Sequence, residues 1–131
     1  MESSNSTRIL IIDDEKEFTD LLQMQMRRCA NVQLRVVNHS EHAIDAARQF
    51  KPAMILLDIV MPGLDGGELL HKFEADETLK KIPVIIVSAL TTQAETASGL
   101  TASGHALIAK PVKTEVLISR IEDLLGHSLR H

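Results

Sequence analysis

The chain has 131 residues, a length typical of a single domain with one complete hydrophobic core. Hydrophobic residues make up 44% of it and charged residues 24%, which favours a globular protein and excludes a disordered one. The formal net charge of −4, with no cluster of Lys and Arg, argues against direct binding of nucleic acid.

Three further features indicate where such a chain works. No apolar run is long enough to span a membrane, so we expect no membrane association. Residues 1–7 are too polar for a signal peptide and are expected to form a flexible N-terminal tail. The single cysteine, Cys29, cannot form an internal disulfide, which favours a reducing, cytoplasmic location.

Five short apolar segments predict strands. In chain order they cover residues 8–12, 32–37, 53–57, 83–87 and 105–109. The first, third and fourth are almost continuously aliphatic, as in strands buried on both faces. The second and fifth are shorter or partly polar, which is typical of edge strands.

Helical patterns lie between these strands. Apolar residues recur at helical spacing from Phe18 to Cys29, from Ala43 to Phe50, from Leu69 to Phe73 and from Leu117 to Leu125. A weaker helix is expected at 92–103, where Thr, Ser and Gly residues lower helix propensity. Strand and helix therefore alternate, which predicts an α/β fold with a parallel sheet and helices on both faces.

Start signals support these helices. Ser40 precedes the second one, and Asp65 with Glu68 has the spacing of a capping box. No shift in composition marks a second domain, so one domain is expected at 8–126, followed by a C-terminal tail at 127–131.

Polar residues follow the predicted strands where each one ends. The chain places there Asp13, Asp14 and Glu15, then Asp58, then Ser88, and finally Lys110 with Pro111. In an open parallel sheet the carboxyl ends of the strands form the ligand-binding edge. The sequence therefore predicts that acids, a hydroxyl and an amine converge at this edge.

This set of groups is suited to phosphoryl transfer onto a carboxylate. Asp58 can act as the nucleophile and form an acyl phosphate. Neighbouring acids repel one another, and a hard dication such as Mg²⁺ would hold them together in the ionised state. Lys110 can pair with one phosphoryl oxygen, and Ser88 can donate a hydrogen bond to another.

Ordinary interpretations exist for each residue alone. Asp14 is also positioned to cap the first helix, with Glu17 at capping-box distance, and the two roles are compatible. Ser88 alone would be a strand-end hydroxyl, and Lys110 alone a solvated surface lysine. Because these residues all stand at the ends of strands in the same predicted sheet, the complete set favours a shared site.

With these residues, the sequence resembles the receiver domains of two-component response regulators from Arg8 to about Leu125. The matching features are the Asp13–Asp14 pair, Asp58, the "MPGLDG" loop at 61–66, Ser88 followed by Ala89, and Lys110–Pro111. The resemblance implies a doubly wound, five-stranded parallel sheet with strand order 2-1-3-4-5. It also implies that Asp58 takes a phosphoryl group from a histidine kinase or a histidine phosphotransfer protein.

The resemblance implies further details of the site. Mg²⁺ or Mn²⁺ would be held by Asp14 and Asp58 directly, by Asp13 through water and by the backbone carbonyl of Val60. The bond before Pro111 is expected to be cis. Such a protein is not a conventional enzyme, because it catalyses its own aspartyl phosphorylation and dephosphorylation. Its signal would pass to a downstream protein or an attached output domain.

Some positions depart from the family pattern. Leu107 stands where many receivers carry Tyr or Phe, three residues before the lysine, so an aromatic switch cannot operate. Val60 and Leu90 are apolar at positions that flank the path of attacking water, which predicts a long-lived acyl phosphate. The weak helix at 92–103 is the candidate for an element that rearranges on phosphorylation.

Other functions remain as alternatives. The first is a receiver-like interaction module that signals without phosphate, which Leu107 keeps open. A hydrolase of the haloacid dehalogenase type would need a second Asp where Val60 stands. A dinucleotide-binding enzyme would need a glycine-rich turn in place of the acids 13–15.

Overall fold

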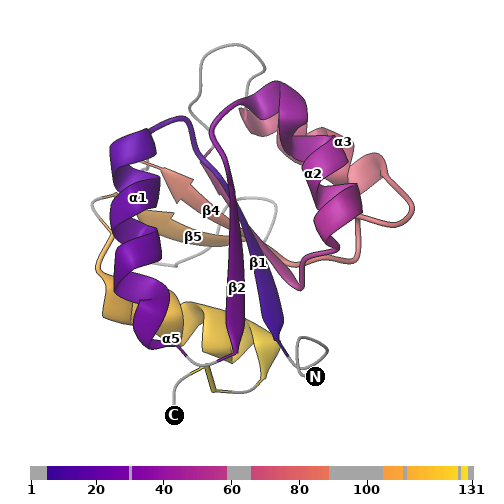
Figure 1. Ribbon diagram of the computed structural model, residues 1–131. Coiled ribbons are helices and arrows are strands. Elements are labelled where there is room, and N and C mark those ends of the chain that lie inside the picture. Colours follow the sequence, from indigo (N-terminus) through magenta and orange to yellow (C-terminus); the bar gives the residue numbers. More distant parts are fainter. Residues whose placement is uncertain are drawn as a thin grey trace.

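The computed structural model describes residues 6–29, 31–58, 66–88, 105–110, 112–126 and 128–129. The strands are β1 (Thr7–Ile12), β2 (Val32–Val37), β3 (Met54–Asp58), β4 (Val84–Ser88) and β5 (Ala106–Ala109). The helices are α1 (Lys16–Gln25), α2 (Ala43–Phe50), α3 (Gly66–Ala75) and α5 (Thr114–Leu125), with 3₁₀ turns at Met26–Arg28 and Ser40–His42 (Figure 1). Strand and helix alternate as the hydrophobic pattern predicts.

The strands form one parallel sheet in the order β2-β1-β3-β4-β5. The predicted doubly wound fold and its strand order are therefore confirmed. Two helices, α1 and α5, cover one face of the sheet, while α2 and α3 cover the other (Figure 1). As expected, β2 and β5 are the edge strands.

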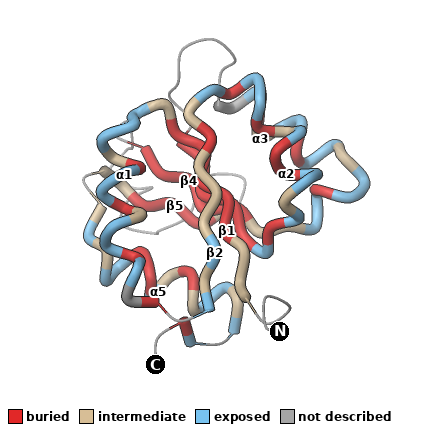
Figure 2. Tube along the Cα trace, in the orientation of Figure 1, coloured by how far each residue is buried: buried red, intermediate tan, exposed pale blue. Residues whose placement is uncertain are grey.

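Alternation along the strands divides the core into two layers. Ile9, Ile11, Met54 and Leu56 pack with α1 and α5, whereas their neighbours Leu10, Ile12, Ile55 and Leu57 pack with α2 and α3. All residues of β3 and β4 are buried, which explains their continuous aliphatic sequences. Figure 2 shows buried residues concentrated along the central strands and exposed residues on the outer sides of the helices.

The strand ends differ slightly from the prediction, and the difference matters for the site. Asp58 and Ser88 are the last residues of β3 and β4, not residues that follow them. The backbone of both polar residues is therefore held by the hydrogen bonds of the sheet. At the other end of the domain, Thr7 already belongs to β1, although the sequence placed it in the N-terminal tail.

The predicted start of the second helix is not found where Ser40 suggested. Ser40 is buried and lies in a 3₁₀ turn, and α2 begins after His42. Neither His39 nor His42, which precede the two helical segments, makes a side-chain capping bond. The chain thus enters α2 through a 3₁₀ turn and not through a side-chain cap.

The segment after α5 returns to the core. Gly126 ends the helix with φ 80°, a left-handed conformation that suits glycine, and its N–H donates to the Glu122 carbonyl at 2.8 Å. Leu129 is only 2% exposed and belongs to the α1–α5 core layer. Its N–H and the Ser128 hydroxyl both donate to Oε2 of Glu122, at 2.8 and 3.1 Å. Part of the expected C-terminal tail is thus packed on the domain.

Some expected features lie outside the described residues. These are the helix at 92–103, the loop residues before Gly66 and the Asp65 cap. Within the described ranges, no helix combines the length and the apolar character needed to cross a lipid bilayer.

Candidate functional site

Three acids meet at the carboxyl edge of the sheet. Asp13 directly follows β1, Asp58 ends β3, and the pairing of Ile12 with Leu57 brings these two strand ends side by side. Asp13 is 1% exposed and Asp58 is 4% exposed. One carboxylate oxygen from each of Asp13, Asp14 and Asp58 lies within 4.8 Å of the other two.

Lys110 brings a positive charge to these acids. It follows β5, and its backbone N–H donates to the Ser88 carbonyl at 3.0 Å, which fixes its position beside β4. Its Nζ lies 2.9 Å from Oδ2 of Asp13 and 3.5 Å from Oδ2 of Asp58, and it also pairs with the Glu15 carboxylate. The predicted convergence of Asp13, Asp58 and Lys110 is therefore present.

The ammonium group also lies over an aromatic ring. The distance from Lys110 Nζ to the centre of the Phe18 ring on α1 is 4.6 Å. The negative face of the ring attracts the cation. Phe18 thus does more than fill the apolar face of the helix, because it supports the side chain that reaches the acids.

Hydrogen bonds from Glu15 and Asn38 hold Asp13. The Glu15 N–H donates to Oδ1 of Asp13 at 2.9 Å, and the Asn38 side-chain amide donates to the Asp13 carbonyl at 2.8 Å. The same Asn38 amide donates to the Thr19 hydroxyl at 3.2 Å, and that hydroxyl donates to the Lys16 carbonyl at 3.0 Å. Thr19 is fully buried, so this network fixes both ends of the turn that carries Asp13.

The charges of the site act on one another. Burial raises the pKa of the Asp13 carboxyl, opposed by the hydrogen bond from Glu15 and by Lys110, while the nearby Asp58 charge adds to the rise. Burial by itself would lower the pKa of the Lys110 ammonium, but its bonds to Glu15 and Asp13 outweigh burial and the pKa is raised. Lys110 therefore stays charged while the acids around it repel one another.

The acids fit a hard divalent cation. Oδ2 of Asp13 is buried, and in the described part of the chain its partner is the Lys110 ammonium at 2.9 Å, which Glu15 and Asp58 share. Buried carboxylates that share one ammonium keep a net negative charge, which is costly and favours binding of a further cation. The ligand set of Asp13, Asp14 and Asp58 consists of oxygen atoms only, which suits Mg²⁺ or Mn²⁺.

Ser88 and Leu107 belong to the opposite layer of the sheet. Alternation along β4 places Ser88 on the face of Val84 and Ile86, which pack with α2 and α3. Ser88 is fully buried and pairs in register with Ala109. Leu107 is buried in that same layer. The hydroxyl at the tip of β4 thus lies next to Asp58 in the sheet but shares its face with Leu107.

Of the two roles that the sequence suggested for Asp14, helix capping and membership of the acid cluster, the structure supports the second. The residue at the N-cap position of α1 is Glu15, and no side chain makes a capping bond there. The idea that Asp14 caps this helix is therefore wrong. Asp14 contributes an oxygen to the acid cluster instead.

Sequence reasoning missed several neighbours of the site. Glu15 was noted only as a third acid, and no role was expected for Phe18, Thr19 or Asn38 in holding Lys110 and Asp13. The expected roles of Val60, Ala89, Leu90 and Pro111 lie outside the described residues and remain predictions.

Comparisons with known proteins identify the family. A model of the response regulator receiver domain matches residues 9–122. The response regulator PleD of Caulobacter vibrioides is 29% identical over 124 residues, which are 95% of this chain and 27% of PleD. The probable transcriptional regulatory protein TcrX of Mycobacterium tuberculosis is 28% identical over 117 residues, 89% of this chain and 49% of TcrX. The chain thus spans half or less of these relatives.

Solved structures agree with the sequence matches. The signal receiver domain of a DNA-binding response regulator from Colwellia psychrerythraea superposes with a TM-score of 0.79 at 25% identity, covering 93% of this chain and 100% of that one. The receiver domain of the Francisella response regulator 1452 gives a TM-score of 0.78, also at 25% identity, over 92% of this chain and 98% of that one. With the family model covering most of its length, this chain belongs to the receiver-domain family of response regulators.

Proposed function

We propose that the protein is a phosphoacceptor switch in which Asp58 takes a phosphoryl group from a phosphohistidine on a partner protein. The observation that carries this proposal is the position of the Lys110 ammonium between oxygens of Asp13 and Asp58. The Asp58 carboxylate, the Asp13–Asp14 pair and the Lys110 ammonium lie at one edge of the sheet. This is the arrangement that phosphoryl transfer needs, because positioning and charge stabilisation do most of the work.

The transfer step uses the side chains as follows. One carboxylate oxygen of Asp58 attacks phosphorus, the P–N bond to the donor imidazole breaks, and the ring takes up a proton as it leaves. Lys110 pairs with one oxygen of the transferred group, and Ser88 donates a hydrogen bond to another. The product is an acyl phosphate on a residue that the sheet holds rigidly.

Asp13, Asp14 and Asp58 are the residues that would hold Mg²⁺ or Mn²⁺, together with the backbone carbonyl of Val60. When bound, the ion supplies positive charge that offsets the repulsion between these carboxylates and the incoming phosphoryl oxygens. Glu15 and Asn38 keep Asp13 oriented toward the other acids through their hydrogen bonds.

The partners follow from the same chemistry. The donor is a histidine kinase or a histidine phosphotransfer protein, and the receiver of the signal is a downstream protein or an attached output domain. The net charge of −4 and the single, buried cysteine Cys29 support a cytoplasmic domain that does not itself bind nucleic acid.

The test is intact-mass analysis after incubation with acetyl phosphate and Mg²⁺. We expect a single phosphoryl adduct in the wild type, which disappears without Mg²⁺ and in the variant Asp58→Asn. Asp45→Asn is the matched control, because Asp45 is an exposed acid on α2, on the other face of the sheet. This control is expected to be phosphorylated like the wild type.

The same experiment decides between the proposal and its alternative. If the wild type forms no adduct, the chain is a receiver-like module that acts without phosphate. The leucine at position 107, buried where many receivers have an aromatic ring, is the residue that favours this alternative. An adduct that persists in Asp58→Asn would place the phosphorylation elsewhere.

A further inference from the structure

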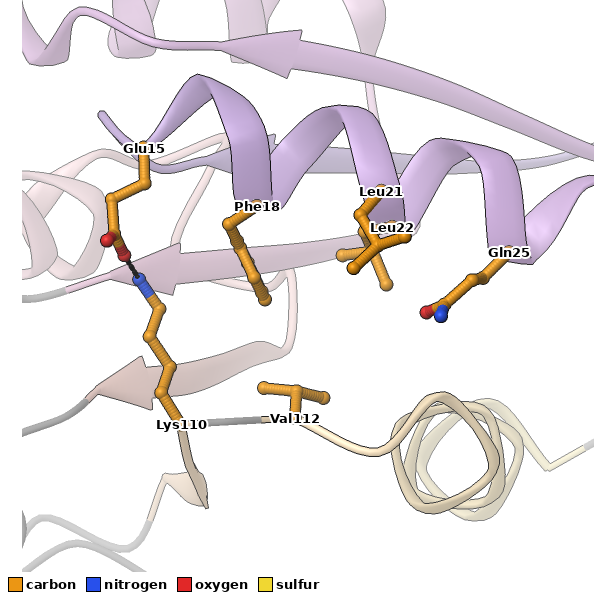
Figure 3. A pocket seen from close by; sticks show the side chains of 7 residues that line it. All are labelled: Glu15, Phe18, Leu21, Leu22, Gln25, Lys110 and Val112. Carbon is orange, nitrogen blue, oxygen red and sulfur yellow. Dashed lines mark hydrogen bonds and ion pairs between the residues drawn. The ribbon is translucent and has the colours of Figure 1, made fainter.

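One ion pair joins two parts of the molecule at the entrance to the acid cluster. Lys110 extends from the end of β5 and meets Glu15, the residue that precedes α1 (Figure 3). Beside this pair a groove of about 420 Å³ runs between α1 and the segment that leads into α5. Its lining includes Phe18, Leu21 and Val112, and Lys110 and Glu15 close one end of it. Lys110 therefore contacts both the groove and the acids.

The Glu15 side chain has no structural role that would explain its place. It makes no capping bond to α1, and 59% of it is exposed. The bond that supports Asp13 comes from the Glu15 backbone N–H, which any residue except proline would provide. In the described part of the chain, the carboxylate pairs with the Lys110 ammonium.

Lys110 is shared among three carboxylates. Its Nζ pairs with Glu15, lies 2.9 Å from Oδ2 of Asp13 and lies 3.5 Å from Oδ2 of Asp58. An ammonium group has three N–H donors, so a phosphoryl oxygen on Asp58 can bind Lys110 only if another acceptor gives way. Asp13 is buried and fixed, whereas Glu15 is exposed and can turn into solvent.

Building on the proposed phosphorylation of Asp58, we propose that Glu15 is a positioning residue that holds Lys110 in the unphosphorylated protein and competes with the phosphoryl group for it. When Asp58 is phosphorylated, Lys110 turns to the phosphoryl oxygen and the Glu15 carboxylate is released at the end of the groove. Glu15 thereby slows phosphorylation and links the state of Asp58 to the surface of α1.

The negative charge of Glu15 is expected to slow phosphorylation of Asp58, as its competition for Lys110 does. Small phosphodonors are anions, and Glu15 adds a negative charge beside Lys110 and the three other acids. Removing that charge favours both the approach of the donor and the pairing of Lys110 with the phosphoryl group. Because the side chain is exposed, salt will screen the effect.

The test compares rates of phosphorylation by acetyl phosphate with Mg²⁺, followed by intact mass. Glu15→Gln is expected to react about three- to tenfold faster than the wild type at low salt, and the difference is expected to shrink at roughly 0.5 M salt. Glu15→Asp, which keeps the charge, is expected to stay closer to the wild type. Glu17→Gln removes the same charge from an exposed position on α1 and controls for net charge, with an expected change of less than about twofold.

A second measurement needs neither metal nor phosphate. Reductive methylation of the lysine amines, followed by peptide mapping, reports how readily Lys110 reacts. We expect Glu15→Gln to increase the reaction of Lys110 several-fold while the exposed Lys113 is unchanged. Equal reactivity in wild type and Glu15→Gln, or equal phosphorylation rates, would overturn the role of Glu15.

These outcomes are separate from the fate of the proposed function. If Asp58 is phosphorylated equally fast in wild type and Glu15→Gln, the switch stands and the role of Glu15 falls. If no adduct forms on any variant, the phosphorylation proposal falls and the competition proposed for Glu15 falls with it, whereas the methylation result still shows whether Glu15 holds Lys110.

Discussion

Two aspartates at opposite edges of the sheet show how one side chain can serve different purposes. Asp13 lies at the carboxyl edge and is buried among other acids. Asp76 lies at the amino edge, in the turn between α3 and β4. Burial raises the pKa of the Asp13 carboxyl. The Arg48 guanidinium, together with the Thr78 hydroxyl and backbone N–H groups, lowers the pKa of the Asp76 carboxyl.

The hydrogen bonds explain this contrast. Oδ1 of Asp76 accepts from the Thr78 hydroxyl at 2.7 Å and from the N–H groups of Thr78 and Leu79 at 2.9 and 3.1 Å. Oδ2 of Asp76 pairs with Arg48 at 2.7 Å. Both oxygens are thus used to hold the turn before β4.

At Asp13, by contrast, the partner of Oδ2 in the described part of the chain is the Lys110 ammonium, which Glu15 and Asp58 share. A carboxylate whose two oxygens are fully bonded stabilises the local structure, whereas buried acids that share one ammonium cost stability and favour binding of a further cation. The contrast supports the proposal that the carboxyl edge of the sheet is the functional one.

The largest expected difference between the two aspartates is in metal binding. Asp13→Asn should weaken Mg²⁺ binding at least about tenfold, because one of the three negative charges that attract the ion is lost. Asp76→Asn makes the same change in net charge at the other edge and should leave Mg²⁺ affinity unchanged. Isothermal titration calorimetry measures both. Equal losses in the two variants would show that overall charge, not a local site, governs binding.

The meeting of the acids and Lys110 could be predicted from the sequence, because it follows from the regular geometry of parallel strands. Strand ends and side-chain alternation are visible in the pattern of aliphatic residues, so the meeting of Asp13, Asp58 and Lys110 was predictable. The alternation also places Ser88 with Leu107 on the other face.

What could not be predicted depends on which rotamers and tertiary contacts the chain adopts. The pairing of Glu15 with Lys110, 95 residues away, leaves no periodic signal. The same holds for the contacts of Asn38 and for Leu129, a single apolar residue after the last helix that the core nevertheless buries. The capping role expected of Asp14 failed because capping spacing shows only that a bond is possible, not that it forms.

A smaller effect is expected on stability in metal-free buffer at neutral pH. Asp58→Asn should raise the free energy of unfolding by about 1 kcal/mol, because it removes one charge from a cluster of mutually repelling buried acids. Asp76→Asn should lower it, because the bond to Arg48 and the turn both weaken. Urea unfolding followed by circular dichroism measures these changes, which suits a chain without Trp or Tyr.

Saturating Mg²⁺ should reverse the difference in stability between Asp58→Asn and the wild type. A ligand that binds only the folded state adds to its stability by mass action, and Asp58→Asn should gain less than the wild type. If Asp58→Asn destabilises the metal-free protein, the acids do not repel one another enough to matter, and the contrast with Asp76 is lost.

The smallest expected effect is in the pH dependence of stability, where the two aspartates should have opposite signs. The pKa of Asp76 is lowered on folding, so its contribution to stability is fully present above the unfolded value of 3.8 and is lost as the pH falls below it toward the folded pKa. The pKa of Asp13 is raised on folding, so the native state binds its proton first. The cost of ionised Asp13 is therefore absent below 3.8 and fully present above its folded pKa.

Unfolding of the metal-free wild type, Asp13→Asn and Asp76→Asn across the acid range tests these signs. The stability advantage of the wild type over Asp76→Asn should shrink as the pH falls below 3.8. The stability of the wild type relative to Asp13→Asn should instead improve as the pH falls through the raised pKa of Asp13 toward 3.8. Parallel curves for all three proteins would mean that neither carboxyl changes its pKa on folding, and the two edges of the sheet would then not differ in the way that their hydrogen bonds indicate.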